Sequence, residues 1–106
     1  MNLYREGIKI FKIYEYAKEK NIFTEITEIF EKVLSEQNED TAERIAAVCF
    51  RNQSALSASL SLHTDESAIR RSIRNFYISF IHRVTVSDKK NELKNLKKAY
   101  ARHIGI

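Results

Sequence analysis

Apolar residues recur every three or four positions along most of this chain, which is the spacing of helices that bury one face. In the first such stretch, residues 2–20, one face carries Leu3, Ile10, Phe11, Tyr14 and Ala17. A second stretch begins at Thr24, whose side chain suits an N-cap, and ends before the polar segment 35–40. Two amphipathic helices are therefore predicted in the first third of the chain.

A third helix is predicted from Asp40 or Thr41 to about Leu62, because Asp40 and Glu43 have the spacing of a capping box. Its second half reads CFRNQSALSASLSL over residues 49–62 and is dominated by serine and alanine. Such small side chains allow neighbouring helices to approach the backbone closely on different sides. This helix is expected to be the packed middle of the molecule.

Asn52 lies on the predicted apolar stripe of this third helix, together with Ile45, Val48, Cys49 and Leu56. A buried amide without partners costs about 1–3 kcal/mol, so Asn52 is expected to be hydrogen-bonded inside the protein. Two interpretations follow from that position. Asn52 either fixes the register between helices or binds a ligand.

The fourth helix is predicted to begin at Thr64 or Asp65, and its apolar residues cover nearly two faces. It is therefore the expected central helix. Residues 84–86, Val-Thr-Val, are expected to form an extended connection that ends at an N-cap on Ser87. A fifth helix from Asp88 to about His103 has a narrow apolar seam among lysines, which is typical of a lid.

The composition supports an all-helical fold, because the chain has no proline and only two glycines. Its 106 residues are sufficient for one core, so a single domain over residues 1–106 is expected. We predict about five helices in stacked antiparallel hairpins, forming a small bundle or short helical repeat with a C-terminal capping helix. One cysteine and the lack of a signal-peptide pattern predict a cytoplasmic protein.

Charge divides the chain into two unlike halves. Residues 1–50 hold seven basic and ten acidic residues, a net charge of −3, whereas residues 51–106 hold eleven and four, a net charge of +7. A basic half can face nucleic acid or an acidic partner. It can equally pack against the acidic half of the same chain or of a second copy.

Catalytic and metal-binding patterns are weak in this sequence. His63, His82 and His103 lie about twenty residues apart, so no pair has metal-ligand spacing. Cys49 lies on an apolar face, where a core role is expected. The sequence therefore predicts a non-enzymatic protein without a cofactor or metal.

Three segments resemble successive parts of tetratricopeptide repeats: FTEITEIFEKVL, FRNQSAL and KAYARHIG, at residues 23–34, 50–56 and 98–105. The repeat spacing, about 43–45 residues, is about ten residues longer than in that family. The resemblance implies stacked helical hairpins that bind protein segments. It also implies that Asn52, Lys98 and Arg102 clamp a peptide carboxylate, and Lys94 on the same basic helix completes the predicted partner-binding set.

The alternative is a DNA-binding regulator. Residues 55–76 read as a helix, a short turn and a second helix, with Arg70, Arg71 and Arg74 early in the second helix. Two features oppose this interpretation: the turn lacks glycine, and the second helix is apolar on two faces. Glu66, four residues before Arg70, also explains part of the cluster as an ion pair within the helix.

The expected function is therefore a binding or regulatory module of the adaptor, inhibitor or immunity type, acting through contacts with a protein partner that is expected to be acidic. A homodimer is predicted from apolar side chains beyond one face per helix: Tyr4, Ile8, Ile13, Tyr16 and Ile78. The competing explanation is that five helices wrap closely enough to bury them all. No membrane partner is expected, because no apolar run approaches about 18 residues.

Overall fold

The computed structural model describes residues 2–22 and 24–105. Its elements in chain order are α1 (Leu3–Glu19), α2 (Glu25–Ser35), α3 (Glu39–Ile45), the π-helical segment η1 (Ala46–Phe50), α4 (Ala55–Ser61), α5 (Glu66–Val86) and α6 (Lys90–His103). No strand forms in these residues, so the all-helical prediction is confirmed. The α-helices number six in this part of the chain and not five, because the predicted third helix is divided.

The starts of the first two helices follow from side-chain caps. Asn2 accepts a hydrogen bond from the Arg5 backbone N–H through its side-chain oxygen at 3.2 Å. Thr24 does the same for Ile26 at 3.2 Å, and its own backbone N–H is bound by Thr27 Oγ1 at 3.1 Å. These bonds satisfy N–H groups that the first turn of a helix leaves without partners, so the predicted starts of α1 and α2 are confirmed.

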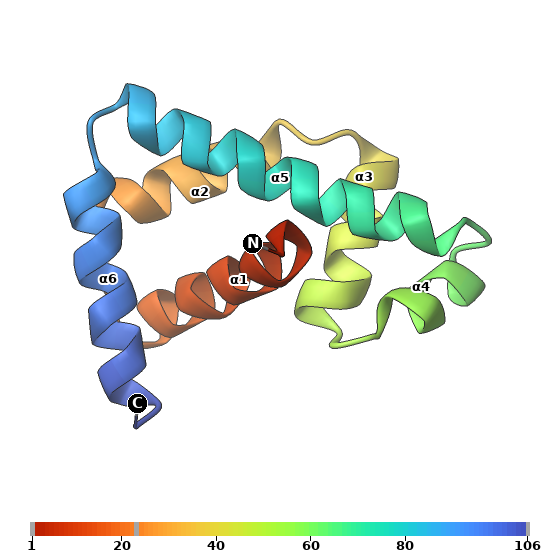
Figure 1. The fold of residues 1–106 in the computed structure, drawn as a ribbon, viewed down its shortest axis with the longest axis horizontal. Helices are drawn as coiled ribbons and strands as arrows, with labels where there is room; N and C mark the ends of the chain where they lie inside the picture. Colours follow the sequence, from red (N-terminus) through yellow and green to blue (C-terminus); the bar gives the residue numbers. More distant parts are fainter. Residues whose placement is uncertain (1, 23, 106) are drawn as a thin grey trace.

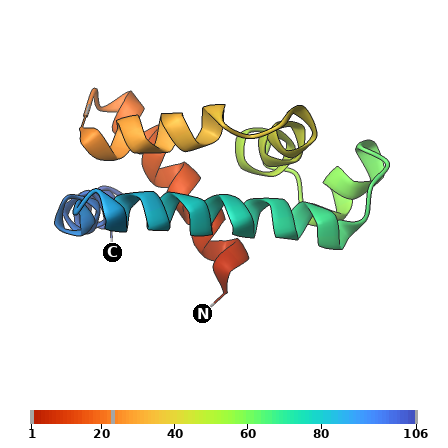
Figure 2. The same ribbon diagram turned by 90° about the horizontal axis from the view of Figure 1, so that it is seen from above.

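Helix α5 runs through the centre of the molecule, as its two-faced apolar pattern predicts. It contacts α1, α2, α3, α4 and α6, and its largest interface is with α1. Figures 1 and 2 show α1 crossing α5 obliquely, with α2 alongside α5 on the same side of α1. Helix α6 closes one end of the molecule, and α4 lies at the opposite end of α5.

The core is an aromatic cluster where α1, α2 and α5 meet. Phe30 stacks on Tyr14 at 4.1 Å between ring centroids and meets the edge of Phe11 at 4.8 Å. From α5, Phe76 and Phe80 lie 5.2 and 5.7 Å from the same ring. Since these four phenylalanines are at most 1% exposed, the cluster joins elements far apart in the sequence into one core.

The predicted third helix is not continuous, and this is the main correction to the sequence interpretation. The π-helical segment η1 follows α3, and the helix then stops at Asn52, whose φ is 57°. The N–H of the next residue, Gln53, donates to the carbonyl of Ala47 at 3.0 Å and closes this end. Asparagine tolerates the left-handed conformation better than most residues, so it takes the role that glycine has in many helix ends.

Asn52 is consequently exposed and is not a buried amide on an apolar stripe. Leu56 of the predicted stripe and Leu60, a further apolar residue of the predicted third helix, are 56% and 69% exposed. The break rotates α4 relative to α3, so the two helices no longer share a face.

Two further helix boundaries differ from the prediction. Helix α3 is capped by Asn38, whose side chain accepts from the Thr41 N–H at 2.8 Å, and not by a box between Asp40 and Glu43. Residues 84–86 continue α5 and are not extended. Ser87 is therefore the C-cap of α5 and not the N-cap of α6. Continuation of the long helix α5 outweighs the strand propensity of the two valines.

The apolar residues that suggested a homodimer are mostly accommodated within one chain. Ile13 is 2% exposed, and Tyr4, Ile8 and Tyr16 pack half-buried against the core. Only Ile78 of the five is largely exposed, at 47%. The wrapping of the helices therefore accounts for four of these side chains.

The two charge halves of the chain contact each other at two ion pairs. Arg83 of α5 lies 2.8 Å from Glu36 at the end of α2, and Lys89 lies 3.0 Å from Glu25 at its start. The hydrogen bond with Glu25 raises the pKa of Lys89 above its usual range. These ion pairs neutralise part of the charge difference within one chain. Most basic side chains of the second half remain exposed and unpaired with the acidic half.

Candidate functional site

The residues predicted to clamp a carboxylate do not meet in the structure. Asn52 lies in the loop between η1 and α4, whereas Lys98 and Arg102 belong to α6. Figures 1 and 2 place that loop and α6 in separate parts of the molecule, toward opposite ends of α5. The three side chains cannot bind one carboxylate together, so the clamp implied by the repeat resemblance is wrong in its geometry.

The basic residues of α6 form an exposed row. Lys94, Lys98 and Arg102 follow one another at four-residue intervals and are all exposed, while Leu93 and Leu96 are buried. The predicted apolar seam is therefore buried in its first half, whereas Ile104 at its end is 48% exposed. The outer face of α6 presents three cations on one side of a helix, where an acidic surface can meet them.

The predicted nucleic-acid residues do come together, in a groove between the start of α5 and the start of α1. We call it the arginine groove; it has a volume of about 810 Å³, and its lining residues are Asn2, Leu3, Tyr4, Ser67, Arg70, Arg71 and Arg74. The arginines come from the first three turns of α5. The opposite wall is the first turn of α1, more than 60 residues away in the sequence.

Within the arginine groove, Arg70 is held in place and the other two arginines are free. The Arg70 guanidinium lies 2.9 Å from Glu66 and 4.7 Å from the centre of the Tyr4 ring. No carboxylate of the described residues lies within ion-pair distance of Arg71 or Arg74, and both are exposed. The predicted pair between Glu66 and Arg70 therefore neutralises only one of the three arginines.

Gly7 fixes the geometry of this groove. A Cβ atom at Gly7 would lie 2.7 Å from the side chain of Ile73 and 3.1 Å from its carbonyl oxygen, so α1 and α5 are in backbone contact there. One turn before this crossing on each helix lie Tyr4 and Arg70. The absence of a side chain at Gly7 thus brings the aromatic ring under the guanidinium.

A second candidate surface is the outer face of α4, which we call the leucine face and define as Leu56 and Leu60. This helix buries its smallest side chains, with Ala55 and Ala58 at 2% and 0% exposed, and turns its leucines outward. Its C-terminal end is closed by His63 with a φ of 54°. The usual relation between size and burial in an amphipathic helix is therefore inverted.

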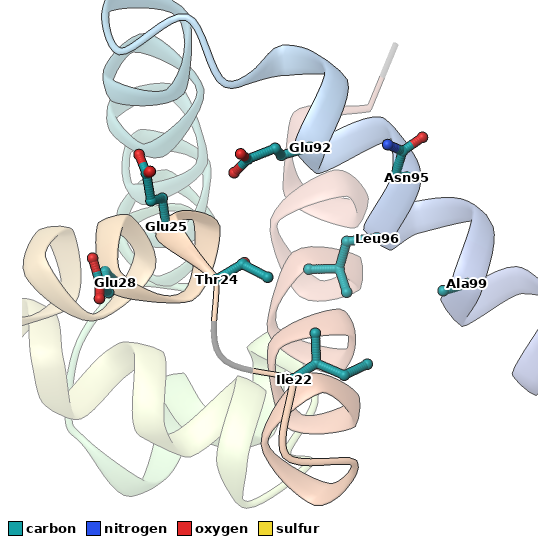
Figure 3. Close-up of a pocket in the computed structure, with 8 residues that line it drawn as sticks. All are labelled: Ile22, Thr24, Glu25, Glu28, Glu92, Asn95, Leu96 and Ala99. Atoms are coloured by element: carbon teal, nitrogen blue, oxygen red, sulfur yellow. The ribbon is translucent and has the colours of Figure 1, made fainter.

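A third feature is a cleft of about 640 Å³ between α2 and α6. Figure 3 shows Glu92 extending from α6 toward α2, with Ile22 and Leu96 in the gap between the helices. Lys89 lies 3.0 Å from Glu25 and 3.7 Å from Glu92, so two of the three carboxylates at this cleft already have a cation.

The candidate catalytic groups stay apart. Burial raises the pKa of Cys49 to about 12, which suppresses the reactive thiolate at neutral pH. In the parts of the chain that the structure describes, no group of three His, Cys, Asp or Glu residues is arranged to hold a metal ion. Across the same residues, no helix combines the length and apolarity that crossing a membrane requires.

Sequence reasoning found the arginines but missed the leucine face and the α1 wall of the groove. The signal for the leucine face was present in ALSASLS, where leucine and small residues occupy different helix faces. A helix continuous through Asn52 would have buried these leucines, and the break at Asn52 exposes them instead. Comparison with known proteins identifies no relative: no protein-family model, no curated protein and no solved structure matches the chain.

Proposed function

We propose that this chain is a non-enzymatic binding module that acts through protein–protein contacts, with the leucine face of α4 as its main docking surface. The observation that supports the proposal is the inverted burial of α4. Leu56 and Leu60 are 56% and 69% exposed while Ala58 of the same helix is 0% exposed. Burying a leucine contributes about 1.5–3 kcal/mol, and the isolated chain leaves most of that free energy unused.

The partner expected at the leucine face presents an apolar groove or an apolar helix. Two leucines one turn apart are the spacing at which one helix anchors in the surface of another protein. Alone they bury less than the roughly 800 Å² per partner of a stable interface, so the contact must extend beyond α4. Serine residues around the leucines provide a polar rim.

The basic row of α6, Lys94, Lys98 and Arg102, is proposed as a separate contact for an acidic protein surface. It is distant from α4 along the molecule (Figure 1), so it is independent of the leucine face. Exposed charges of this kind increase association rates more than affinity. Weakening of binding by salt would distinguish this contact from the apolar one.

Other expectations from the sequence remain proposals of the same kind. These are a cytoplasmic location, a homodimer, and stacked hairpins related to tetratricopeptide repeats. The observation for a cytoplasmic location is the single cysteine, Cys49. The observation for self-association is the leucine face, since Tyr4, Ile8, Ile13 and Tyr16 pack within one chain.

The proposed docking is tested by comparing two substitutions at equally exposed apolar positions. Leu60 and Val86 are both 69% exposed, but Val86 ends α5 and lies outside the leucine face. Immobilised wild type, Leu60→Ser and Val86→Ser are used to capture proteins from a lysate of the native cell, with quantification by mass spectrometry. A partner captured by wild type and Val86→Ser but lost with Leu60→Ser supports the proposal. Equal capture by all three contradicts it.

Light scattering decides whether the partner is a second copy of the chain. A dimeric mass at micromolar concentration that becomes monomeric in Leu60→Ser identifies self-association through α4. A monomeric wild type removes the homodimer and leaves the protein partner as the proposal.

A further inference from the structure

We propose that the arginine groove is a site for the phosphate backbone of duplex DNA. This goes beyond the docking proposed for α4, because it involves other residues, another chemistry and another class of partner. The groove combines cationic side chains, helix starts and an adjoining polar helix face, and each of these favours a polyanion.

The free arginines are the primary observation. Arg71 and Arg74 are one helical turn apart and have no carboxylate partner among the described residues. A guanidinium presents a planar set of N–H donors that matches phosphate oxygens, and most protein–DNA hydrogen bonds go to phosphate and sugar. Two such groups on one edge of a groove can bind neighbouring phosphates of one strand.

Arg70 makes the groove a preorganised site. Its guanidinium is fixed between Glu66 and the Tyr4 ring, at 2.9 and 4.7 Å. Arg70 therefore orders the wall of the groove and keeps the Tyr4 side chain in position. Less side-chain freedom is then lost when a ligand binds, which increases affinity for the same contacts.

Both helices that form the groove begin there. The first turn of α1 follows Asn2, and the first turn of α5 follows Asp65. Helix N-termini carry a partial positive charge, and their N–H groups favour phosphate. The side chains of Asn2 and Ser67 add neutral donors on the two walls, so the electrostatic attraction of the arginines is supplemented by hydrogen bonds.

The exposed half of α5 continues the groove as a surface without carboxylates. After Glu66, its exposed residues are Ser67, Arg70, Arg71, Arg74, Asn75, Ile78, Ser79, His82, Thr85 and Val86. Arginine, asparagine, serine and threonine are the side chains that contact phosphates and base edges in DNA complexes. The apolar character that opposed a DNA-binding role is thus confined to the buried half and to Ile78 and Val86.

The arrangement favours a duplex over a single strand. Proteins that bind single strands stack unpaired bases on exposed aromatic rings. The only aromatic ring lining the described part of the groove is that of Tyr4, and the Arg70 guanidinium covers it. In addition, α4 and α5 form the predicted helix–turn–helix order, with the arginines early in the second helix.

The test is fluorescence anisotropy with a labelled duplex of about 20 base pairs, in salt from about 50 to 200 mM. The variant Arg71→Gln with Arg74→Gln removes two cations from the groove. The matched control, Lys20→Gln with Lys32→Gln, removes two exposed cations from the ends of α1 and α2. Circular dichroism and thermal unfolding of each variant show that the fold is retained.

We expect the wild type to bind the duplex with an affinity that falls steeply as salt rises. The groove variant should bind at least roughly tenfold more weakly, and its slope against the logarithm of salt should be smaller by about 2, since each phosphate contact contributes about 0.9. The control variant should keep both the affinity and the slope of the wild type within about twofold.

Four results would overturn the proposal. They are no binding of the duplex at the lowest salt, equal weakening by the groove and control variants, tighter binding of a single-stranded RNA or DNA of the same length, and competition by polyglutamate as strong as that by unlabelled duplex. The last two would assign the groove to a single strand or to an acidic protein segment. Because Leu60→Ser should bind the duplex like wild type, a failure here is separable from a failure of the docking proposed for α4.

Discussion

The aromatic core and helix α4 bury opposite kinds of side chain. In the core, large rings point inward, and Phe30 is 1% exposed among four other aromatic side chains. In α4, the inward residues are alanine and serine, and the large side chains, Leu56 and Leu60, point outward. Both regions pack against the same helix, α5. The difference between them therefore comes from their own amino-acid sequences.

This comparison separates residues that maintain the fold from residues available for a partner. Core rings gain free energy by leaving water when the chain folds. The leucines of α4 gain little, because folding leaves more than half of each exposed. The close approach of α4 to α5 depends instead on the absence of side-chain volume at Ala55 and Ala58. Substitutions in the two regions should therefore differ in kind: removing volume should be costly in the core, whereas adding volume should be costly on the buried side of α4.

The largest effect is expected for Phe30→Ala. Removing this ring leaves a cavity bordered by Phe11, Tyr14, Phe76 and Phe80, at a cost of about 3–5 kcal/mol in the free energy of unfolding. Urea unfolding followed by circular dichroism measures it. Phe50→Ala is the matched control, since Phe50 is 41% exposed and should cost much less. Equal losses of unfolding free energy in both variants would contradict the assignment of the core. If Phe30→Ala does not fold, the smaller change Phe30→Leu takes its place in the comparison.

Gly7→Ala should destabilise the protein by about 1–3 kcal/mol, because one methyl group would overlap Ile73 at the crossing of α1 and α5. In most exposed helix positions this substitution stabilises by up to about 1 kcal/mol, so the sign alone tests the close contact. Thermal unfolding gives the result. A stabilised Gly7→Ala would show that the helices cross elsewhere.

Ala58→Leu should cost about 1–3 kcal/mol, since Ala58 is 0% exposed and a larger side chain must push α4 away from α5. Ser57→Leu on the exposed side of α4 adds similar volume and is expected to be nearly neutral. Chemical unfolding of both variants gives the comparison. Neutral behaviour of Ala58→Leu would mean that α4 is loosely attached and that its inverted burial is not a constraint of the fold.

The smallest effect on stability is expected for Leu60→Ser. Since this side chain is 69% exposed, its replacement should change the free energy of unfolding by no more than about 0.5 kcal/mol. Unfolding in urea at two protein concentrations measures it. A loss of several kcal/mol would place Leu60 in the core and remove it from any docking surface.

The sequence predicted the helices whose apolar pattern is regular. Four of the five predicted helices correspond to α1, α2, α5 and α6, and Thr24 was identified as an N-cap. The break within the third was missed because Asn52 fits a helical stripe as well as a helix end. Left-handed φ values at Asn21, His63 and Asp88 end three other helices in the same way, in a chain with only two glycines.

The candidate sites show the same limit. The arginines were identified from sequence because they are neighbours on one helix. Their partner wall on α1 depends on the crossing at Gly7, more than 60 residues away, and no local pattern reveals such a contact. The predicted carboxylate clamp also depended on a contact between distant parts of the chain, and that contact does not form. It required the third and last helices to meet, and the break at Asn52 directs α4 to the other end of α5.

The most direct test of the leucine face is photo-crosslinking in the native cell. The photoreactive residue p-benzoylphenylalanine is placed at position 60 in one variant and at position 86 in another, two sites of equal exposure. The account predicts a discrete crosslinked product from position 60 that is absent from position 86 and disappears when Leu56→Ser is added. Crosslinks of the same kind and amount from both positions, or none from position 60 in a folded and expressed protein, would contradict it.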